Sequence, residues 1–243
     1  MVTLKMLFKL VVHDIALYTM RRTRPLLDTA AGDTIFDPDL DPIPRAALAV
    51  LLTLCCGTVA YTSIDAVFHM TTLVGRVLLR QPATDWPALS ARPWMATSIT
   101  DFWSFRWHQS ARHTFISWGA RPGARPGGAL LGRPGALLGA FAISAVIHYV
   151  SMWGVGEGIE LNAGAFFIQM GVGAMLEHVW MNATGARVRG LWGWVWTMSW
   201  TLFWGTFLVD VWARHGIIAC DSFIPGRPGK LIVDGIIALV TKN

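Results

Sequence analysis

Ser98-Ile-Thr-Asp-Phe-Trp-Ser-Phe-Arg-Trp-His-Gln109 is the most informative stretch of this chain, and a lone His148 follows it about forty residues later inside an apolar run. The stretch sets ionisable and amide side chains among large aromatic rings. The polar members are Asp101, Arg106, His108 and Gln109, and the aromatic members include Phe102, Trp103 and Trp107. An ionisable side chain at membrane depth is costly to place, so it is a functional-site hypothesis by default. The two stretches together predict a polar site inside a helical membrane protein.

Composition supports a membrane protein. The 243 residues are 53% hydrophobic and only 14% charged, whereas a soluble domain carries about 25% charged residues. Tryptophan, which favours membrane interfaces, occurs 13 times. The length allows one domain of several spans, but not a membrane domain joined to a folded soluble domain.

Charge and cysteine content narrow the class further. The net charge is +5, and most of it comes from arginines in loops beside apolar segments, with no dense basic stripe. We therefore expect no nucleic-acid partner, and we interpret the arginines as residues that set membrane topology. The three cysteines, Cys55, Cys56 and Cys220, are predicted to be free thiols because their spacing builds no disulfide framework.

Hydrophobic patterning predicts an all-α, multi-span integral membrane protein with about four to five transmembrane helices plus amphipathic or re-entrant helices. Residues 1–45 form an N-terminal part, with an interface-lying helix over 1–20 and a polar connector over 21–45. Residues 46–243 form the membrane domain. The predicted spans are 46–70, 130–155, 163–181 and 191–212, and the apolar segment 231–240 is too short to cross.

The positive-inside rule gives an orientation. The 76–128 loop holds seven arginines against two acidic residues, and the 182–190 loop holds two more arginines. The turn between the second and third predicted spans instead holds Glu157 and Glu160. We expect both arginine-bearing loops to face the cytosol.

The aromatic and basic stretch is predicted to continue as one helix over 98–118. On such a helix His108 would lie one turn from Ser104 and Arg112. A purely structural interpretation is an interfacial helix anchored by tryptophan and arginine. The Arg-Pro-Gly tripeptide that begins at Arg121 recurs at positions 125 and 133. We interpret these repeats as low-complexity sequence in a flexible loop rather than as a phosphate-binding loop.

The stretch Trp94–Gln109, with Arg112 following, resembles the signature of the wax-synthase-like branch of the membrane-bound O-acyltransferase superfamily. Asp85-Trp86-Pro87 resembles the Trp-Pro element upstream of that signature, and Ile147-His148-Tyr149 matches the embedded histidine. The resemblance covers roughly residues 84–215. It implies transfer of an acyl group from acyl-CoA, as co-substrate, to the hydroxyl of a lipophilic alcohol, long-chain or terpenoid, without a cofactor. It also implies an endoplasmic reticulum membrane and, for fungal members, a place in lipid or terpenoid secondary metabolism.

The resemblance assigns the catalytic base to His148 and the second polar position to His108. An imidazole can take the proton of a weakly nucleophilic alcohol as its oxygen attacks the thioester. Trp103 and Gln109 are candidates to orient the thioester or stabilise the oxyanion, and Arg106 and Arg112 to hold CoA phosphates. The predicted substrate-binding set is Asp101, Trp103, Arg106, Trp107, Gln109 and Arg112.

Other readings stay open at this stage. A buried histidine can simply bridge two helices, and His13, His69, His113 and His215 are expected to be solvated or interfacial. We expect no metal site, because the seven histidines are scattered. A membrane terpene cyclase would use a buried acid, and Glu177, although expected at the interface, is one candidate for that role. The other candidate acids are Asp65 and Asp210.

A non-catalytic scaffold or degenerate homologue is the third alternative. The family normally has more spans, so oligomeric completion is possible.

Overall fold

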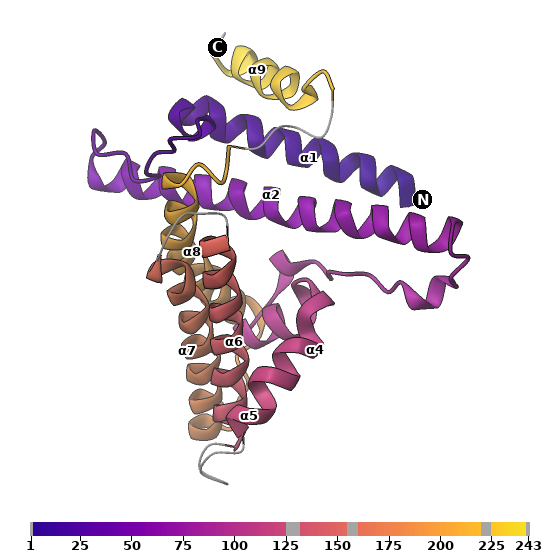
Figure 1. Ribbon diagram of the computed structural model, residues 1–243. Coiled ribbons are helices and arrows are strands. Elements are labelled where there is room, and N and C mark those ends of the chain that lie inside the picture. Colours follow the sequence, from indigo (N-terminus) through magenta and orange to yellow (C-terminus); the bar gives the residue numbers. More distant parts are fainter. Residues whose placement is uncertain (1, 125–131, 155–159, 220–224, 242–243) are drawn as a thin grey trace. The chain divides into compact units, whose positions relative to one another are not determined.

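The computed structural model describes residues 2–124, 132–154, 160–219 and 225–241. Every secondary-structure element in these four ranges is helical, which confirms the all-α fold. The long helices are α1 (Val2–Thr23), α2 (Pro42–Val77), α6 (Gly132–Gly154), α7 (Leu161–Thr184), α8 (Gly190–Arg214) and α9 (Pro228–Thr241) (Figure 1). The chain divides into two compact units, which we call unit 1 (residues 1–87 and 212–243) and unit 2 (residues 88–211).

Two helices in the described residues, α2 and α6, are long and apolar enough to cross a membrane. Most of each apolar segment is exposed, unlike the buried core helix of a soluble protein. The other predicted spans, 163–181 and 191–212, form the helices α7 and α8, but the count of four to five spans is not confirmed. One reason is that α8 carries six tryptophans, which favour the membrane interface over the hydrocarbon core.

Unit 1 is built around α1, which packs against α2 and α9. The buried face of α1 includes polar residues. His13 is only 1% exposed, and its Nδ1 lies 3.0 Å from Thr62 Oγ1 on α2. Asp14 accepts a 2.7 Å hydrogen bond from the Gly229 backbone N–H at the start of α9. The expectation that His13 is solvated is therefore wrong, because it is buried between two packed helices.

An ion-pair cluster also joins α1 to α2. Lys9 Nζ lies 2.5 Å from Asp65 Oδ2, and His69 Nδ1 lies 3.1 Å from the same oxygen. The pKa of Lys9 is raised: burial alone would lower it, but the hydrogen bonds to Asp65 and Tyr61 outweigh that effect. Asp65, at 6% side-chain exposure, is thus held by two basic partners.

Unit 2 depends on close helix crossings made by glycine. The π-helical turn η6 (Phe115–Ala120) and the short helix α5 (Arg121–Ala124) cross α6 with almost no space between the backbones. A Cβ on Gly119 would lie 2.3 Å from the carbonyl oxygen of Gly139, and one on Gly123 would lie 2.2 Å from that of Gly135. Small residues spaced four apart on both crossing segments allow the backbones to approach this closely.

The predicted helix over 98–118 is wrong. The chain there forms α3 (Ile99–Asp101), the π-helical turn η4 (Phe102–Arg106), the 3₁₀ turn η5 (Gln109–Ala111), α4 (Arg112–Thr114) and η6. The helix breaks at Trp107 and His108, whose ψ angles are 151° and 115°. The backbone N–H of Gln109 donates to the carbonyl of Leu89 instead of to a helical partner. Pairing with an upstream segment therefore replaces helix continuation.

Candidate active site

Glu177 on α7 anchors the start of the broken segment. Its carboxylate accepts hydrogen bonds from the Ile99 N–H at 2.5 Å, the Thr100 N–H at 3.1 Å and the Thr100 hydroxyl at 2.9 Å. A fourth bond, at 3.1 Å, comes from the Trp196 indole N–H on α8. Glu177 is buried within the protein at 8% exposure, and its place at the membrane interface stays a prediction. It satisfies the N–H groups at the start of α3 that have no helical partner.

The next turn gathers the aromatic residues. The Ser98 hydroxyl accepts from the Asp101 N–H at 2.9 Å and caps α3. In η4 the Trp107 N–H donates to the Phe102 carbonyl, five residues back, at 2.8 Å. The Phe102 and Trp107 rings stack with centroids 5.6 Å apart, and Trp103 meets Trp107 edge-on. π-helical turns are frequent at functional sites.

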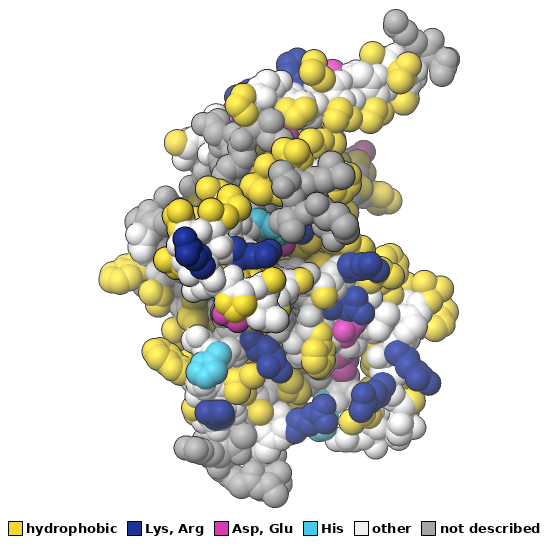
Figure 2. Space-filling model, turned by 90° about the vertical axis from the view of Figure 1, so that its right-hand side faces the viewer, with side chains coloured by type: hydrophobic (Ala, Val, Ile, Leu, Met, Phe, Trp, Pro, Cys, Tyr) yellow, Lys and Arg dark blue, Asp and Glu magenta, His cyan; other side chains and the backbone are white. Residues whose placement is uncertain are grey.

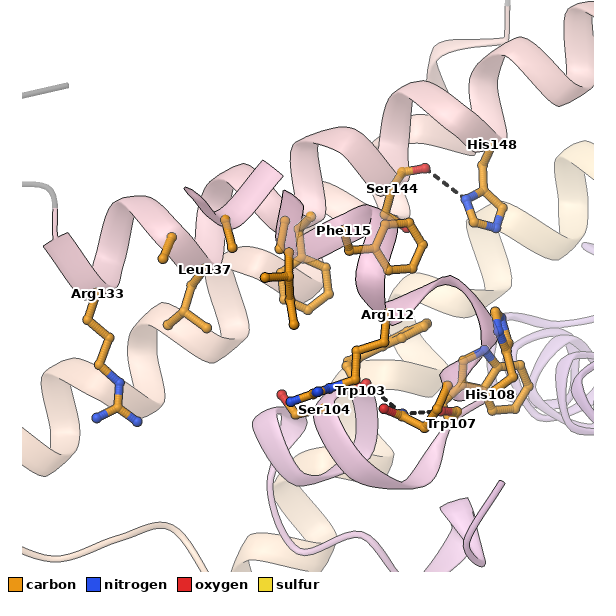
Figure 3. A pocket seen from close by; sticks show the side chains of 16 residues that line it. Trp103, Ser104, Trp107, His108, Arg112, Phe115, Arg133, Leu137, Ser144 and His148 are labelled. Carbon is orange, nitrogen blue, oxygen red and sulfur yellow. Dashed lines mark hydrogen bonds between the residues drawn. The ribbon is translucent and has the colours of Figure 1, made fainter. Parts of the chain in front are cut away.

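These turns and α6 enclose a pocket of about 240 Å³, which we call the histidine pocket (Figure 3). The segment from η4 to η6 lines one part of the pocket, and α6 lines the rest. The structure brings six of the eight sequence-predicted site residues to it, namely Trp103, Trp107, His108, Gln109, Arg112 and His148. Residues 40 positions apart in the chain thus share one cavity.

His148 presents one ring nitrogen to the pocket. Its Nδ1 lies 2.8 Å from the backbone carbonyl of Ser144, one turn earlier on α6. A carbonyl oxygen only accepts, so Nδ1 carries the proton and Nε2 of the neutral ring keeps its lone pair. The ring stacks on Phe167 of α7 with centroids 3.8 Å apart, which fixes its plane. The geometry is that of an oriented acceptor of protons.

His108 lies near His148 at the same end of the pocket (Figure 3). Burial lowers the pKa of His108, and the charge of a protonated His148 lowers it further. Burial therefore favours a neutral His108 ring near pH 7, and the second effect adds to it only when His148 is protonated. Gln109, the next residue, donates to the Trp107 carbonyl at 2.5 Å and so holds the turn on which His108 stands.

The rest of the pocket wall is mainly aromatic and aliphatic. Trp103 packs edge-on against Phe141 of α6 and against Phe166 and Phe167 of α7. Its indole N–H is buried and has no hydrogen-bond partner among the described residues. A buried donor without an acceptor is costly, and a ligand oxygen would satisfy it.

Asp101 and Arg106 are not part of this pocket. They pair with each other instead, with Arg106 Nε 2.7 Å from Asp101 Oδ2 and both side chains roughly three-quarters buried. The Arg106 guanidinium also approaches the carbonyls of Ala91 and Arg92. Arg106 is thus engaged in holding the upstream segment, whereas Arg112 is exposed and lines the pocket.

Sequence reasoning missed several pocket residues. Ser144 was not singled out, although its position four residues before His148 is the helical spacing for a backbone contact. Phe167, which orients His148, lies on another helix, and no local pattern links the two. The Arg-Pro-Gly repeats, which we had interpreted as low-complexity sequence in a flexible loop, also contribute to this region. Arg133 lines the pocket, and Gly123 packs against Gly135 at the helix crossing. The repeat at 125–127 lies outside the described residues.

The acids proposed for a cyclase do not face the histidine pocket. Glu177 accepts four hydrogen bonds and Asp65 is paired with Lys9 and His69. Carboxylates occupied as acceptors are poorly placed to donate a proton to a substrate. Among the described residues, no three His, Cys, Asp or Glu side chains cluster as metal ligands would.

Comparison with known proteins points to one family. Residues 86–169 match the membrane bound O-acyl transferase family. The matched segment is about a third of the chain and contains both pocket histidines. It supports membership in that superfamily, whose members are generally acyltransferases, and agrees with the two apolar helices. No curated protein and no solved structure matches the chain significantly.

Proposed function

We propose that this protein transfers an acyl group from acyl-CoA to the hydroxyl of a lipophilic alcohol. The observation that carries the proposal is the histidine pocket, in which an oriented His148 with an available Nε2 faces His108 within the family-matched segment. Its aromatic and aliphatic walls suit an acyl chain.

In the proposed reaction, His148 Nε2 takes the proton of the alcohol as its oxygen attacks the thioester carbonyl. The Trp103 N–H, which has no described partner, is a donor for the oxyanion that forms. The carbon–sulfur bond then breaks, and the imidazolium returns its proton to the departing CoA sulfur. The products are an ester and free CoA. His108 acts beside His148 as a second neutral ring that positions the acceptor or the thioester.

The finer features belong to the same proposal. They are membership in the wax-synthase-like branch, a fungal origin, a role in secondary metabolism and residence in the endoplasmic reticulum with the 76–128 loop in the cytosol. The lipid bilayer and the two substrates are the expected partners. An oligomer could complete the membrane domain.

The decisive experiment gives purified protein a long-chain acyl-CoA and a hydroxylated lipid, and measures free CoA and ester. We expect release of one CoA for each ester, abolished in His148→Ala and retained in His113→Ala, an exposed histidine of the same segment. Unchanged turnover in His148→Ala would refute the base assignment. Conversion of a terpenoid to an isomer of equal mass, without CoA release, would favour the cyclase instead.

A further inference from the structure

A second pocket of about 430 Å³ lies where α6 and α8 begin and α7 ends, and we call it the arginine pocket. Three arginines line it: Arg133 at the start of α6, and Arg187 and Arg189 in the segment before α8. All three are exposed. Arg133 also lines the histidine pocket, so the two pockets adjoin. The space-filling view shows basic side chains outnumbering acidic ones on one face of the protein (Figure 2).

The positive charge of the arginine pocket is not balanced within the described part of the chain. The acidic residues of the pocket do not cancel this charge, because Asp101 pairs with Arg106 through Oδ2 and Glu177 supplies one negative charge against three arginines. Within the described part of the chain, none of the three arginine side chains has an ion-pair or hydrogen-bond partner. Guanidinium groups that converge without acidic partners attract an anion.

The local backbone adds to the attraction. The N-termini of α6 and α8 lie at this end of unit 2, and helix N-termini carry partial positive charge. Planar guanidinium groups bind phosphate oxygens in pairs, and several of them match a multiply charged group. We propose that Arg133, Arg187 and Arg189 form a binding site for a phosphate-bearing ligand.

Two sources supply this chemistry: the nucleotide phosphates of CoA and the head group of an anionic phospholipid. Arg133 and His148 are fifteen residues apart on α6, so they are separated by roughly 22 Å along the helix. In Figure 3 they lie at opposite ends of the histidine pocket. That separation is comparable to an extended CoA molecule, with its thioester at one end and its phosphates at the other. The CoA source rests on the proposed function, whereas the phosphate site does not.

The test uses full-length protein in neutral detergent and a variant with Arg133→Gln, Arg187→Gln and Arg189→Gln. The control variant carries Arg76→Gln, Arg80→Gln and Arg227→Gln, which remove the same charge from exposed positions of unit 1. The probes are free CoA, short-chain phosphatidic acid and, as a phosphate-free reference, short-chain diacylglycerol. Affinity is measured by calorimetry for each probe.

We expect the site variant to bind one phosphate probe about tenfold more weakly or worse, with the control variant within about twofold of wild type. Loss for CoA identifies the donor phosphates, and loss for phosphatidic acid alone identifies a lipid head group. Equal affinities in the site variant and wild type would overturn the site, as would an equal loss in the control. Wild-type protein that binds neither phosphate probe would overturn it as well.

The two proposals fail separately. His148→Ala removes the proposed base but leaves the arginine pocket intact, so it should still bind the phosphate probe. A protein that binds the probe through these arginines yet never releases CoA from acyl-CoA would refute the proposed function and leave the phosphate site standing.

Discussion

The buried carboxylates of unit 1 and the polar groups around the histidine pocket of unit 2 differ in how much of their bonding capacity is used. In unit 1, Asp65 holds two basic partners and Asp14 accepts from a backbone N–H. In the histidine pocket, His148 uses one ring nitrogen and Trp103 leaves its N–H without a described partner. Satisfied groups fix helices in place, whereas unsatisfied groups around a cavity are available to a ligand.

The largest expected effect separates two histidines that both lie in long helices, the buried His13 and the half-buried His148. His148→Gln should lower the rate of CoA release by about 10²–10⁴-fold, because glutamine cannot take up the proton. His13→Gln should leave turnover per folded molecule near wild type but lower stability by about 1–3 kcal/mol, since it disturbs the contact with Thr62.

Both variants are compared by CoA release at equal amounts of folded protein and by thermal unfolding in detergent. Loss of turnover in His13→Gln as complete as in His148→Gln would contradict the assignment of a structural role to His13 and a catalytic role to His148. A change in only the unfolding temperature of both variants would contradict it as well.

Glu177 shows that unit 2 also contains a saturated group. Glu177→Leu should cost about 3–5 kcal/mol of unfolding free energy, because three N–H groups and a hydroxyl lose their acceptor in the interior. Glu177→Gln, which keeps one acceptor oxygen, should lose less. Asp41→Asn is the matched control, since Asp41 is exposed and makes no capping hydrogen bond.

Chemical denaturation read by tryptophan fluorescence measures these costs. If Glu177→Leu were as stable as wild type, Glu177 would not be the anchor of the broken segment. The acid role required by a cyclase would then return to consideration.

The positions of the long helices could be predicted from sequence because their signal is local. Apolar runs bounded by polar or glycine-containing segments gave α6, α7 and α8 to within a few residues of their bounds. The break at Trp107 was not predictable, because its cause is pairing with a segment almost twenty residues upstream, and aromatic patterning alone favours a continuous helix. Tertiary contacts override such local preference.

The site was predictable in part for the same reason. His108 and His148 were found as unusual residues in their local surroundings, and the cavity does bring them together. Arg106 was assigned to phosphates because it lies beside His108 in sequence. Its pairing with Asp101 at a turn, rather than along a helix, could not be seen without the fold. Arg133 was not recognised, because it belongs to an Arg-Pro-Gly repeat that we interpreted as a flexible low-complexity loop.

The glycine crossing tests whether the shape of the histidine pocket matters as well as its polar groups. Gly139→Ala places a Cβ about as close to the Gly119 backbone as the 2.3 Å contact already described, so η6 must shift away from α6. We expect a stability cost of about 1–3 kcal/mol and a weaker affinity for the acyl donor. Gly154→Ala, at the other end of α6, meets nothing within 4 Å and should be neutral.

Unfolding midpoints and the KM for acyl-CoA distinguish the two glycine variants. Equal behaviour of Gly139→Ala and Gly154→Ala would mean that the close crossing does not shape the pocket.

The smallest expected effect is a difference in pH dependence between the units. The lowered pKa of His108 means that the unfolded state binds more protons than the folded state as pH falls through about 6.5, so stability falls on acidification. The raised pKa of Lys9 acts in the opposite range, and its contribution is lost as pH rises above about 10.5. The pKa of His13 is also lowered, mainly by burial, so the acid effect is shared.

Replacing His108 by Gln should therefore reduce the loss of stability between about pH 6.5 and pH 5, which we call the acid limb of the stability curve. It should not change the loss of stability above about pH 10.5, which we call the alkaline limb. Lys9→Met should change the alkaline limb and leave the acid limb as it was. Unfolding midpoints measured from pH 5 to pH 11 resolve the two limbs. An acid limb unchanged in His108→Gln would show that His108 is not the acid-sensitive group, and His13→Gln would then test the buried histidine of unit 1 in the same way.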